Sequence, residues 1–238
     1  MTTLTRIIAT SIISALLLSC NFTTGVEGNG NVVKANRTIN QNINEIKISN
    51  GLDLYITQSN NQALSIETDE NLQNLIITEV VDGTLNIYTS ENIGRATLKK
   101  VMLDIKTISK ITATSGSDVF SNNTVKVSNL ELNSTSGADI KLNVLTESLS
   151  CNSTSGSDID VSGSTMKLVA SATSGSDIDA SQLIAEIADV SVTSGADINV
   201  NTTKILTAQA TSGGDVKYLG NPETINKSDN SAGSIKRY

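Results

Sequence analysis

The sequence predicts an all-β protein, a right-handed parallel β-helix or solenoid with coils of about 20 residues. The motif Thr-Ser-Gly-x-Asp, followed by Ile or Val, occurs six times, with steps of 21, 19, 19, 20 and 18 residues between successive glycines. Between the motifs, apolar residues alternate with polar ones, as in half-buried strands. Long helix-forming windows are absent after the first twenty residues, and aromatic residues make up only 3%. We therefore expect a narrow aliphatic core.

The six motifs place glycine and aspartate at equivalent positions of successive coils. Glycine permits a positive φ at a tight corner, and we expect the motif's Ser and Asp side chains to hydrogen-bond nearby backbone amides. The residue between Gly and Asp is always Ser, Ala or Gly, so we place it inward and the aspartate outward. The repeat residues are Gly116, Asp118, Gly137, Asp139, Gly156, Asp158, Gly175, Asp177, Gly195, Asp197, Gly213 and Asp215.

Stacking the coils would bring these aspartates into one outward ladder with carboxylates about 5 Å apart. Like charges at that spacing repel, so they need hydrogen-bond donors, protonation or a cation. The plainer interpretation is that the motif is architecture. The more specific interpretation is a Ca²⁺ site, because carboxylate oxygens are preferred ligands of Ca²⁺. Calcium is the only cofactor that the sequence suggests. Its candidate ligands are Asp158, Asp160, Asp177 and Asp179.

Four segments follow from these patterns. They are a signal peptide (1–19), a tether (20–30), an N-terminal β region (31–110) and the solenoid (111–238). The N-terminal β region alternates like strands but lacks the crisp repeat, apart from one relative of the motif at residues 49–53. Asp82-Gly83 predicts a hairpin. We expect this region to be a β-domain covering the end of the solenoid, or to continue it as irregular coils.

The first twenty residues predict export and lipidation. Arg6 precedes an apolar run from Ile7 to Leu18, which is shorter than the roughly 20 apolar residues that span a bilayer. The run ends in Leu-Leu-Ser-Cys20, which resembles a bacterial lipobox, whose cysteine is lipidated and becomes the new N-terminus. Several acyl chains would anchor the protein stably, since each buried CH₂ contributes about 0.8 kcal/mol. We expect an outer-membrane lipoprotein facing the periplasm or the outside; an ordinary secretory signal is the alternative.

Composition excludes several functions. The chain has no His, which removes His-based triads and most zinc chemistry. Its net charge is −7 and it has no Lys/Arg cluster, so nucleic acid is not an expected partner. Cys151, the thiol left after lipidation of Cys20, lies in a strand-like run and is predicted to be a small core residue. We find no catalytic constellation and predict that the protein is not an enzyme.

Residues 48–58 (ISNGLDLYITQ), residues 81–87 (VDGTLNI) and the ending GGDVKYLGNP at 213–222 carry a family resemblance. Together with the Ser-Gly-x-Asp repeats they resemble the head GIN domain family of auto-transporter adhesins, which is common in Bacteroidetes-type bacteria. The resemblance covers about residues 30–238. It implies an exported binding protein and brings no catalytic residues.

Export, tether and solenoid favour a non-catalytic binding or adhesion module of the cell envelope. Its partners would be the membrane, through Cys20, and an envelope or extracellular protein or glycan. The obvious aromatic candidates for a glycan are Tyr55, Tyr88 and Tyr218. One alternative is a structural lipoprotein that maintains the envelope. Another is a polysaccharide lyase or hydrolase, because Asp158 and Asp160 could act as an acid/base pair, although no cationic cluster marks a uronate site.

Overall fold

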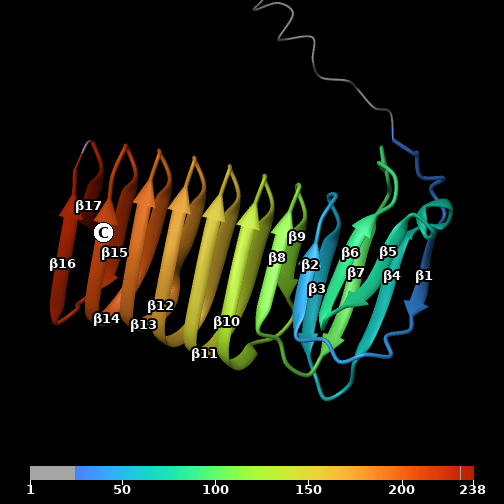
Figure 1. The fold of residues 1–238 in the computed structure, drawn as a ribbon, viewed down its shortest axis with the longest axis horizontal. Helices are drawn as coiled ribbons and strands as arrows, with labels where there is room; N and C mark the ends of the chain where they lie inside the picture. Colours follow the sequence, from blue (N-terminus) through green and yellow to red (C-terminus); the bar gives the residue numbers. More distant parts are fainter. Residues whose placement is uncertain (1–24, 231) are drawn as a thin grey trace, which may run out of the picture.

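The computed structural model describes residues 25–230 and 232–238 and shows one stack of coils (Figure 1). About seven turns of roughly 19 residues follow one another, and 67% of the described residues are in strands. No α-helix occurs in the described ranges, and within them no helix is long and apolar enough to cross a membrane. The predicted parallel β-solenoid is confirmed. The predicted signal peptide and Cys20 lie outside the described residues.

The chain forms seventeen strands and one short 3₁₀-helix within the described ranges. The first elements are β1 (Val32–Arg37), β2 (Glu45–Ile48), β3 (Asp53–Gln58), β4 (Ala63–Asp69), η1 (Glu70–Leu72), β5 (Ile76–Val81), β6 (Thr84–Thr89), β7 (Lys99–Ile105), β8 (Lys110–Thr114) and β9 (Asp118–Ser121). They are followed by β10 (Val125–Thr135), β11 (Asp139–Thr154), β12 (Asp158–Thr173), β13 (Asp177–Thr193), β14 (Asp197–Ala210), β15 (Asp215–Gly220), β16 (Thr224–Asp229) and β17 (Ser234–Arg237).

The solenoid has two sheet faces that meet at the motif corner and at a bend. Each long strand, β11 to β14, bends in its middle and belongs to both faces; in β11, residues 139–141 pair with β9 and residues 148–154 with β10. We call one face the aspartate face: the outward side chains of β3, β9, the first halves of β11–β14, β15 and β17. The other, the threonine face, comprises those of β8, β10, the second halves of β11–β14, and β16. Both faces are built from parallel neighbours.

The motif corner is a turn in which two consecutive residues are left-handed. Ser155 has φ 61° and Gly156 has φ 66°, and the other five copies repeat this geometry. The corners are joined to one another, because the Gly137 N–H donates to the Ser155 carbonyl (3.3 Å) and the Asp158 N–H donates to the Ala138 carbonyl (3.1 Å). Glycine at the second position is therefore explained by its conformation, as predicted, whereas the left-handed serine before it was not predicted.

Where the middle residue of the motif is Ser, its hydroxyl hydrogen-bonds the backbone of the corner. Ser157 is fully buried; its hydroxyl donates to the Thr154 carbonyl (2.9 Å) and accepts the Thr154 N–H (3.1 Å). The first serine has only a long contact with the preceding threonine, 3.5 Å between the Thr173 and Ser174 hydroxyls. The inward position of the middle residue is thus confirmed, but the expectation that the first serine hydrogen-bonds the backbone is wrong.

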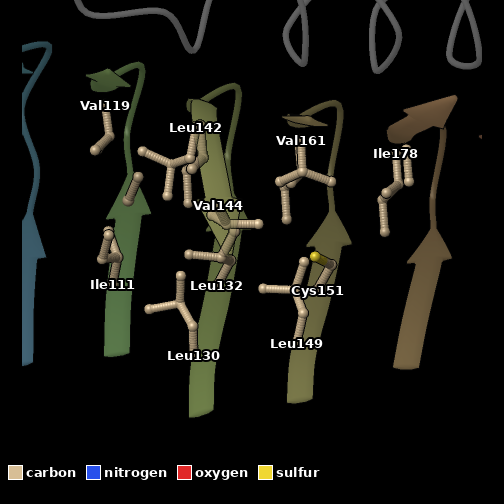
Figure 2. Close-up of a cluster of buried hydrophobic side chains, with 14 of the residues drawn as sticks. Ile111, Val119, Leu130, Leu132, Leu142, Val144, Leu149, Cys151, Val161 and Ile178 are labelled. Carbon is tan, nitrogen blue, oxygen red and sulfur yellow. The ribbon is translucent and has the colours of Figure 1, made fainter. Parts of the chain in front are cut away.

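The core consists of aliphatic ladders that run along the solenoid (Figure 2). One ladder joins buried residues of the threonine-face strands: Ile111, Leu132, Cys151, Ala170, Val190 and Ala208. The other joins Val119, Ile140, Ile159, Ile178, Ile198 and Val216. Cys151 is fully buried and burial raises the pKa of its thiol to about 12, so it is a core residue, as predicted.

The order of coils in space differs from their order in the chain at the N-terminal end. The coil β2–β3 lies between the coil β6–β7 and the coil β8–β9, with parallel pairing on both sides. Its corner, Asn50-Gly51, has φ values of 66° and 65°, and the Gly51 N–H donates to the Ser115 carbonyl (3.0 Å). The relationship expected from residues 49–53 is therefore confirmed, since this segment is a coil stacked directly on the first repeat.

Antiparallel strands extend both faces beyond that coil. On the aspartate face β4 pairs with β7 and β1 with β4; on the other, β5 pairs with β6 through the predicted hairpin at Asp82-Gly83. The buried carboxylate of Asp69 ties this end together by accepting the N–H groups of Gly30 (2.6 Å) and Thr97 (2.7 Å) and the Thr97 hydroxyl (3.0 Å). Burial alone would raise the pKa of Asp69, but these hydrogen bonds together lower it.

We predict that two substitutions in one corner differ in their effect on the free energy of unfolding. A Cβ at Gly156 would meet no atom within 4 Å, so Gly156→Ala adds only left-handed strain and should cost about 1–2 kcal/mol of unfolding free energy. Ser155→Gly relieves that strain at the preceding residue and should not destabilise the protein. Urea unfolding of both variants provides the measurement. Equal unfolding midpoints for Gly156→Ala and the wild type would contradict this account of the corner.

Candidate binding face

The aspartate face carries a continuous ladder of seven aspartates on in-register parallel strands. The ladder consists of Asp53, Asp118, Asp139, Asp158, Asp177, Asp197 and Asp215, and Ser234 follows it. The predicted ladder is therefore real, and Asp53 from the inserted coil lengthens it. Neighbouring carboxylates are held about 4.8 Å apart along the strand-pairing direction.

Burial and neighbouring charges shift the carboxyl pKa values of this ladder. The carboxyl pKa is raised at four rungs, and burial is the largest cause at each: Asp53, Asp118, Asp158 and Asp197. Repulsion adds to burial, from Asp139 at both Asp118 and Asp158. The positive charge of Lys99 offsets part of the rise in pKa at Asp53 and Asp118, and Lys217 does the same at Asp197. The positive charges thus relieve the ends of the ladder more than its middle.

The four candidate calcium ligands lie in two adjacent columns. Asp158 neighbours Asp177 in the ladder, and Asp160 neighbours Asp179 in the next column. Lys141 forms an ion pair with Asp160 across the strands, so this carboxylate already has a counter-charge. Over the described ranges no group of three or more His, Cys, Asp or Glu residues is placed to hold a metal ion.

Calcium binding by these four residues stays a prediction from sequence spacing. If it is correct, millimolar Ca²⁺ should raise the melting temperature of the purified protein, because a ligand that binds only the folded state stabilises it. Thermal melts with Ca²⁺ and with chelator make the measurement, and identical curves would contradict calcium binding.

An aromatic pair occupies the same face near the N-terminal end. The rings of Tyr55 and Phe120 stack with centroids 5.1 Å apart and an interplanar angle of 28°, and the Lys100 ammonium lies 4.2 Å from the Tyr55 centroid. Both contacts use the faces of the Tyr55 ring, which are the surfaces that a sugar would stack on. Phe120 was missed by sequence reasoning, although it follows the aspartate of its coil by two residues, as Tyr55 does.

The three tyrosines proposed as glycan contacts are not brought together. The Tyr88 hydroxyl donates to Glu79 (3.1 Å) on the side of the threonine face. Tyr218 is almost fully buried near the C-terminal end, with the Lys227 ammonium 4.4 Å from its ring centroid. These three tyrosines therefore do not form one site.

A groove opens where β1, β4 and β7 continue the aspartate face. Its volume is about 580 Å³, and its lining includes Lys34, Asn36, Gln62, Met102, Asp104 and Asn122. It adjoins the aromatic pair, because Met102 pairs with Tyr55 across the sheet and Asp104 with Thr57. In Figure 1, β1 and β4 lie at a clear angle to the regular coils, as expected from strand twist. Sequence reasoning did not find this groove.

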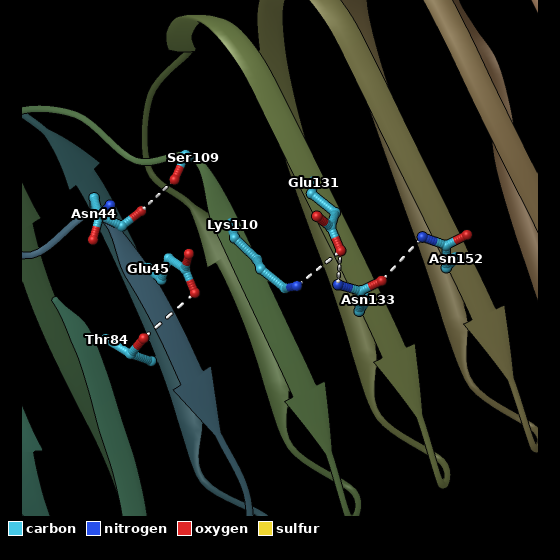
Figure 3. Close-up of polar contacts among 8 residues, drawn as sticks. All are labelled: Asn44, Glu45, Thr84, Ser109, Lys110, Glu131, Asn133 and Asn152. Atoms are coloured by element: carbon cyan, nitrogen blue, oxygen red, sulfur yellow. Dashed lines mark hydrogen bonds and ion pairs between the residues drawn. The ribbon is translucent and has the colours of Figure 1, made fainter. Parts of the chain in front are cut away.

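The threonine face is flat and mostly uncharged. One column carries the motif threonines Thr114, Thr135, Thr154, Thr173 and Thr193. Beside it, polar contacts link neighbouring strands (Figure 3): Lys110 forms an ion pair with Glu131 (3.0 Å) and Asn152 donates to Asn133 (3.0 Å) across strands, and Asn133 donates to Glu131 (2.7 Å) within β10. These contacts occupy part of the hydrogen-bonding capacity of Glu131, Asn133 and Asn152.

Large apolar side chains are exposed along the bend. Leu145, Met166 and Ile184 are 48%, 56% and 55% exposed, and Ile187 and Ile205 are about half-buried neighbours. This apolar edge was missed, although a signal exists: in the pairs Val144-Leu145 and Leu183-Ile184, only one residue of each can face the core of a strand.

Comparison with known proteins fits this architecture. The family described as "Putative auto-transporter adhesin, head GIN domain" matches residues 42–222. The chain belongs to the head GIN domain family. The predicted family is thereby confirmed, and the match spans both the inserted coil and the repeats. No curated protein matches the chain.

Solved structures share the fold of this head GIN domain protein. A putative adhesin from Bacteroides fragilis superposes with a TM-score of 0.84 at 22% identity, covering 90% of this chain and 100% of the other. A putative lipid binding protein from Parabacteroides distasonis gives 0.73 at 26% identity, with 90% and 99% covered. A putative adhesin from Parabacteroides merdae gives 0.72 at 20% identity, with 90% and 98% covered.

We predict that removing one charge from the ladder stabilises the head GIN domain at neutral pH. Because the pKa of Asp158 is higher in the folded protein than its ordinary value, folding favours its protonated form. The resulting destabilisation is full above the raised pKa and disappears as pH falls toward the ordinary pKa. Asp158→Asn should therefore raise the melting temperature at pH 7, and its advantage over the wild type should shrink as the pH is lowered.

Asp160→Asn is the matched control, since it removes a neighbouring carboxylate that is paired with Lys141. It should leave the melting temperature at pH 7 unchanged or lower. If Asp158→Asn instead melts below the wild type at pH 7, the Asp158 carboxylate stabilises the protein and the prediction is wrong.

Proposed function

We propose that this head GIN domain protein is a lipid-anchored, non-catalytic binding module of the cell envelope. The observation that carries the proposal is the aspartate face, which is rigidly spaced by backbone hydrogen bonds and ends in an open polar groove. The adhesin descriptions of the family and of two structural neighbours support a binding role at the cell surface or envelope.

The side chains of the protein do not favour catalysis. The chain contains no His, and its one described cysteine is sealed in the core with a raised pKa, which makes thiolate chemistry unfavourable. Of the pair proposed for a lyase, Asp160 is bound to Lys141, and Asp158 is a rung among like charges. Turnover of a polyuronate that is lost in Asp158→Asn would overturn this part of the proposal.

Lipidation of Cys20 would orient the solenoid. The described chain begins at Gly25, and five residues extend over no more than about 18 Å. The coils near β1 would therefore lie close to the membrane, and the C-terminal coils would project away from it.

We predict that Cys20→Ser abolishes incorporation of labelled palmitate and moves the protein from the membrane fraction to the soluble fraction. The chain provides a matched control, because Cys151→Ser removes the other cysteine and should keep the label. Equal labelling of Cys20→Ser and the wild type would contradict the anchor. Protease treatment of intact cells, with lysed cells as control, then identifies the side of the membrane on which the ligand must be sought.

A further inference from the structure

We propose that the groove between β1, β4 and β7 binds an uncharged oligosaccharide through its ring hydroxyls. This inference rests on the proposed binding function and names the site and ligand class for it. The groove of about 580 Å³ has the size of known small-ligand sites. It lies at the point where the repeated surface ends, so its residues are unique rather than repeated from coil to coil.

The groove presents hydrogen-bonding groups that the protein itself leaves unused. In the described part of the chain, neither the Asp104 carboxylate nor the Asn36 amide makes a side-chain hydrogen bond, and the Lys34 ammonium has only a 4.0 Å contact with the Met102 sulfur. A carboxylate can accept hydrogen bonds from two adjacent hydroxyls, and an amide can both donate and accept. Vicinal hydroxyls on a sugar ring match this set.

Other lining residues are held in place by the protein. The Asn122 amide donates to the Thr57 hydroxyl (3.0 Å), which leaves its carbonyl oxygen free, and the Gln62 amide donates to the Gln41 carbonyl (2.9 Å). The Arg37 guanidinium donates to the Gln73 carbonyl (2.6 Å). These bonds fix acceptor positions before a ligand arrives, which reduces the ordering cost of binding. The Met102 side chain adds an apolar surface for the C–H side of a sugar.

The carboxylate of Asp104 favours a hydroxyl over an acidic group as its neighbour in the ligand, because it would repel a uronate or sialate carboxylate. The lining also holds the positive charges of Lys34 and Arg37, and the Arg37 guanidinium donates to the Gln73 carbonyl. Among the described residues neither cation forms an ion pair with Asp104, so this carboxylate is open to the hydroxyls of an uncharged glycan. Stacking on Tyr55 does not contribute, because Phe120 and Lys100 occupy its ring faces.

Binding is tested with the full mature chain against a panel of hexasaccharides: chito-, cello- and manno-oligosaccharides as uncharged probes, and oligogalacturonate as the acidic probe. We expect an uncharged probe to bind with little dependence on salt. Asp104→Asn should then weaken binding about tenfold or more, because hydrogen bonds to a charged acceptor are the strong ones. Asp189→Asn, an exposed carboxylate on the threonine face, is the matched control and should bind like the wild type.

Three outcomes overturn the groove proposal: no probe binds, only oligogalacturonate binds, or Asp104→Asn binds as tightly as the wild type. Equal melting temperatures of Asp104→Asn and the wild type exclude misfolding as the cause of lost binding. Adding polysaccharide extracted from the producing cells as a competitor separates a ligand of the cell's own envelope from one of outside origin. Retained attachment of Asp104→Asn to whole cells or matrix would refute the groove and leave the proposed binding function standing. A wild-type protein that neither anchors to the membrane nor attaches to cells or matrix would refute the function itself.

Discussion

The structure depends on parallel backbone hydrogen bonding between coils in fixed register. Each strand pairs with the equivalent strand of the next coil, and the corners are joined in the same way, as by the Gly156 N–H and the Ser174 carbonyl (3.3 Å). This constraint stacks every side chain on its counterpart. Where the counterparts are aliphatic, the result is a continuous core ladder such as Ile140, Ile159 and Ile178, which removes apolar surface from water.

The same constraint places like charges next to one another wherever the repeated residue is aspartate. In-register stacking brings carboxylates together whether or not the fold benefits, and repulsion from Asp139 adds to burial, the larger cause, in raising the pKa of Asp118 and Asp158. The aspartate nonetheless contributes to the corner, since the carboxylates of Asp158 and Asp197 accept the backbone N–H of the next rung, Asp177 and Asp215 respectively. Lys99 and Lys217 offset part of the rise in carboxyl pKa near the ends of the ladder, whereas no cation lowers the pKa of Asp158 in its middle.

The repeat made most of this predictable. A fixed period near 19 residues, small middle residues and outward aspartates determine the coil, the corner and the ladder without knowledge of any long-range contact. The inserted coil was predictable only in part, because residues 49–53 resemble the motif but nothing local says that β2–β3 stacks between β6–β7 and β8–β9. The groove was not predictable, since Asn36, Asp104 and Asn122 come from segments that pair only once this non-sequential order is known.

That difference explains where a specific site can lie in such a molecule. Identical coils can only produce uniform columns, such as the aspartate ladder or the motif threonines, and a uniform column offers a ligand the same group at every step. Selective recognition needs different groups at fixed positions, together with a hollow. Both arise where β4 runs antiparallel to β7 and β1 antiparallel to β4, and these strands twist away from the regular stack. The break in the repeat is therefore the place where the fold gains the chemical variety that binding requires.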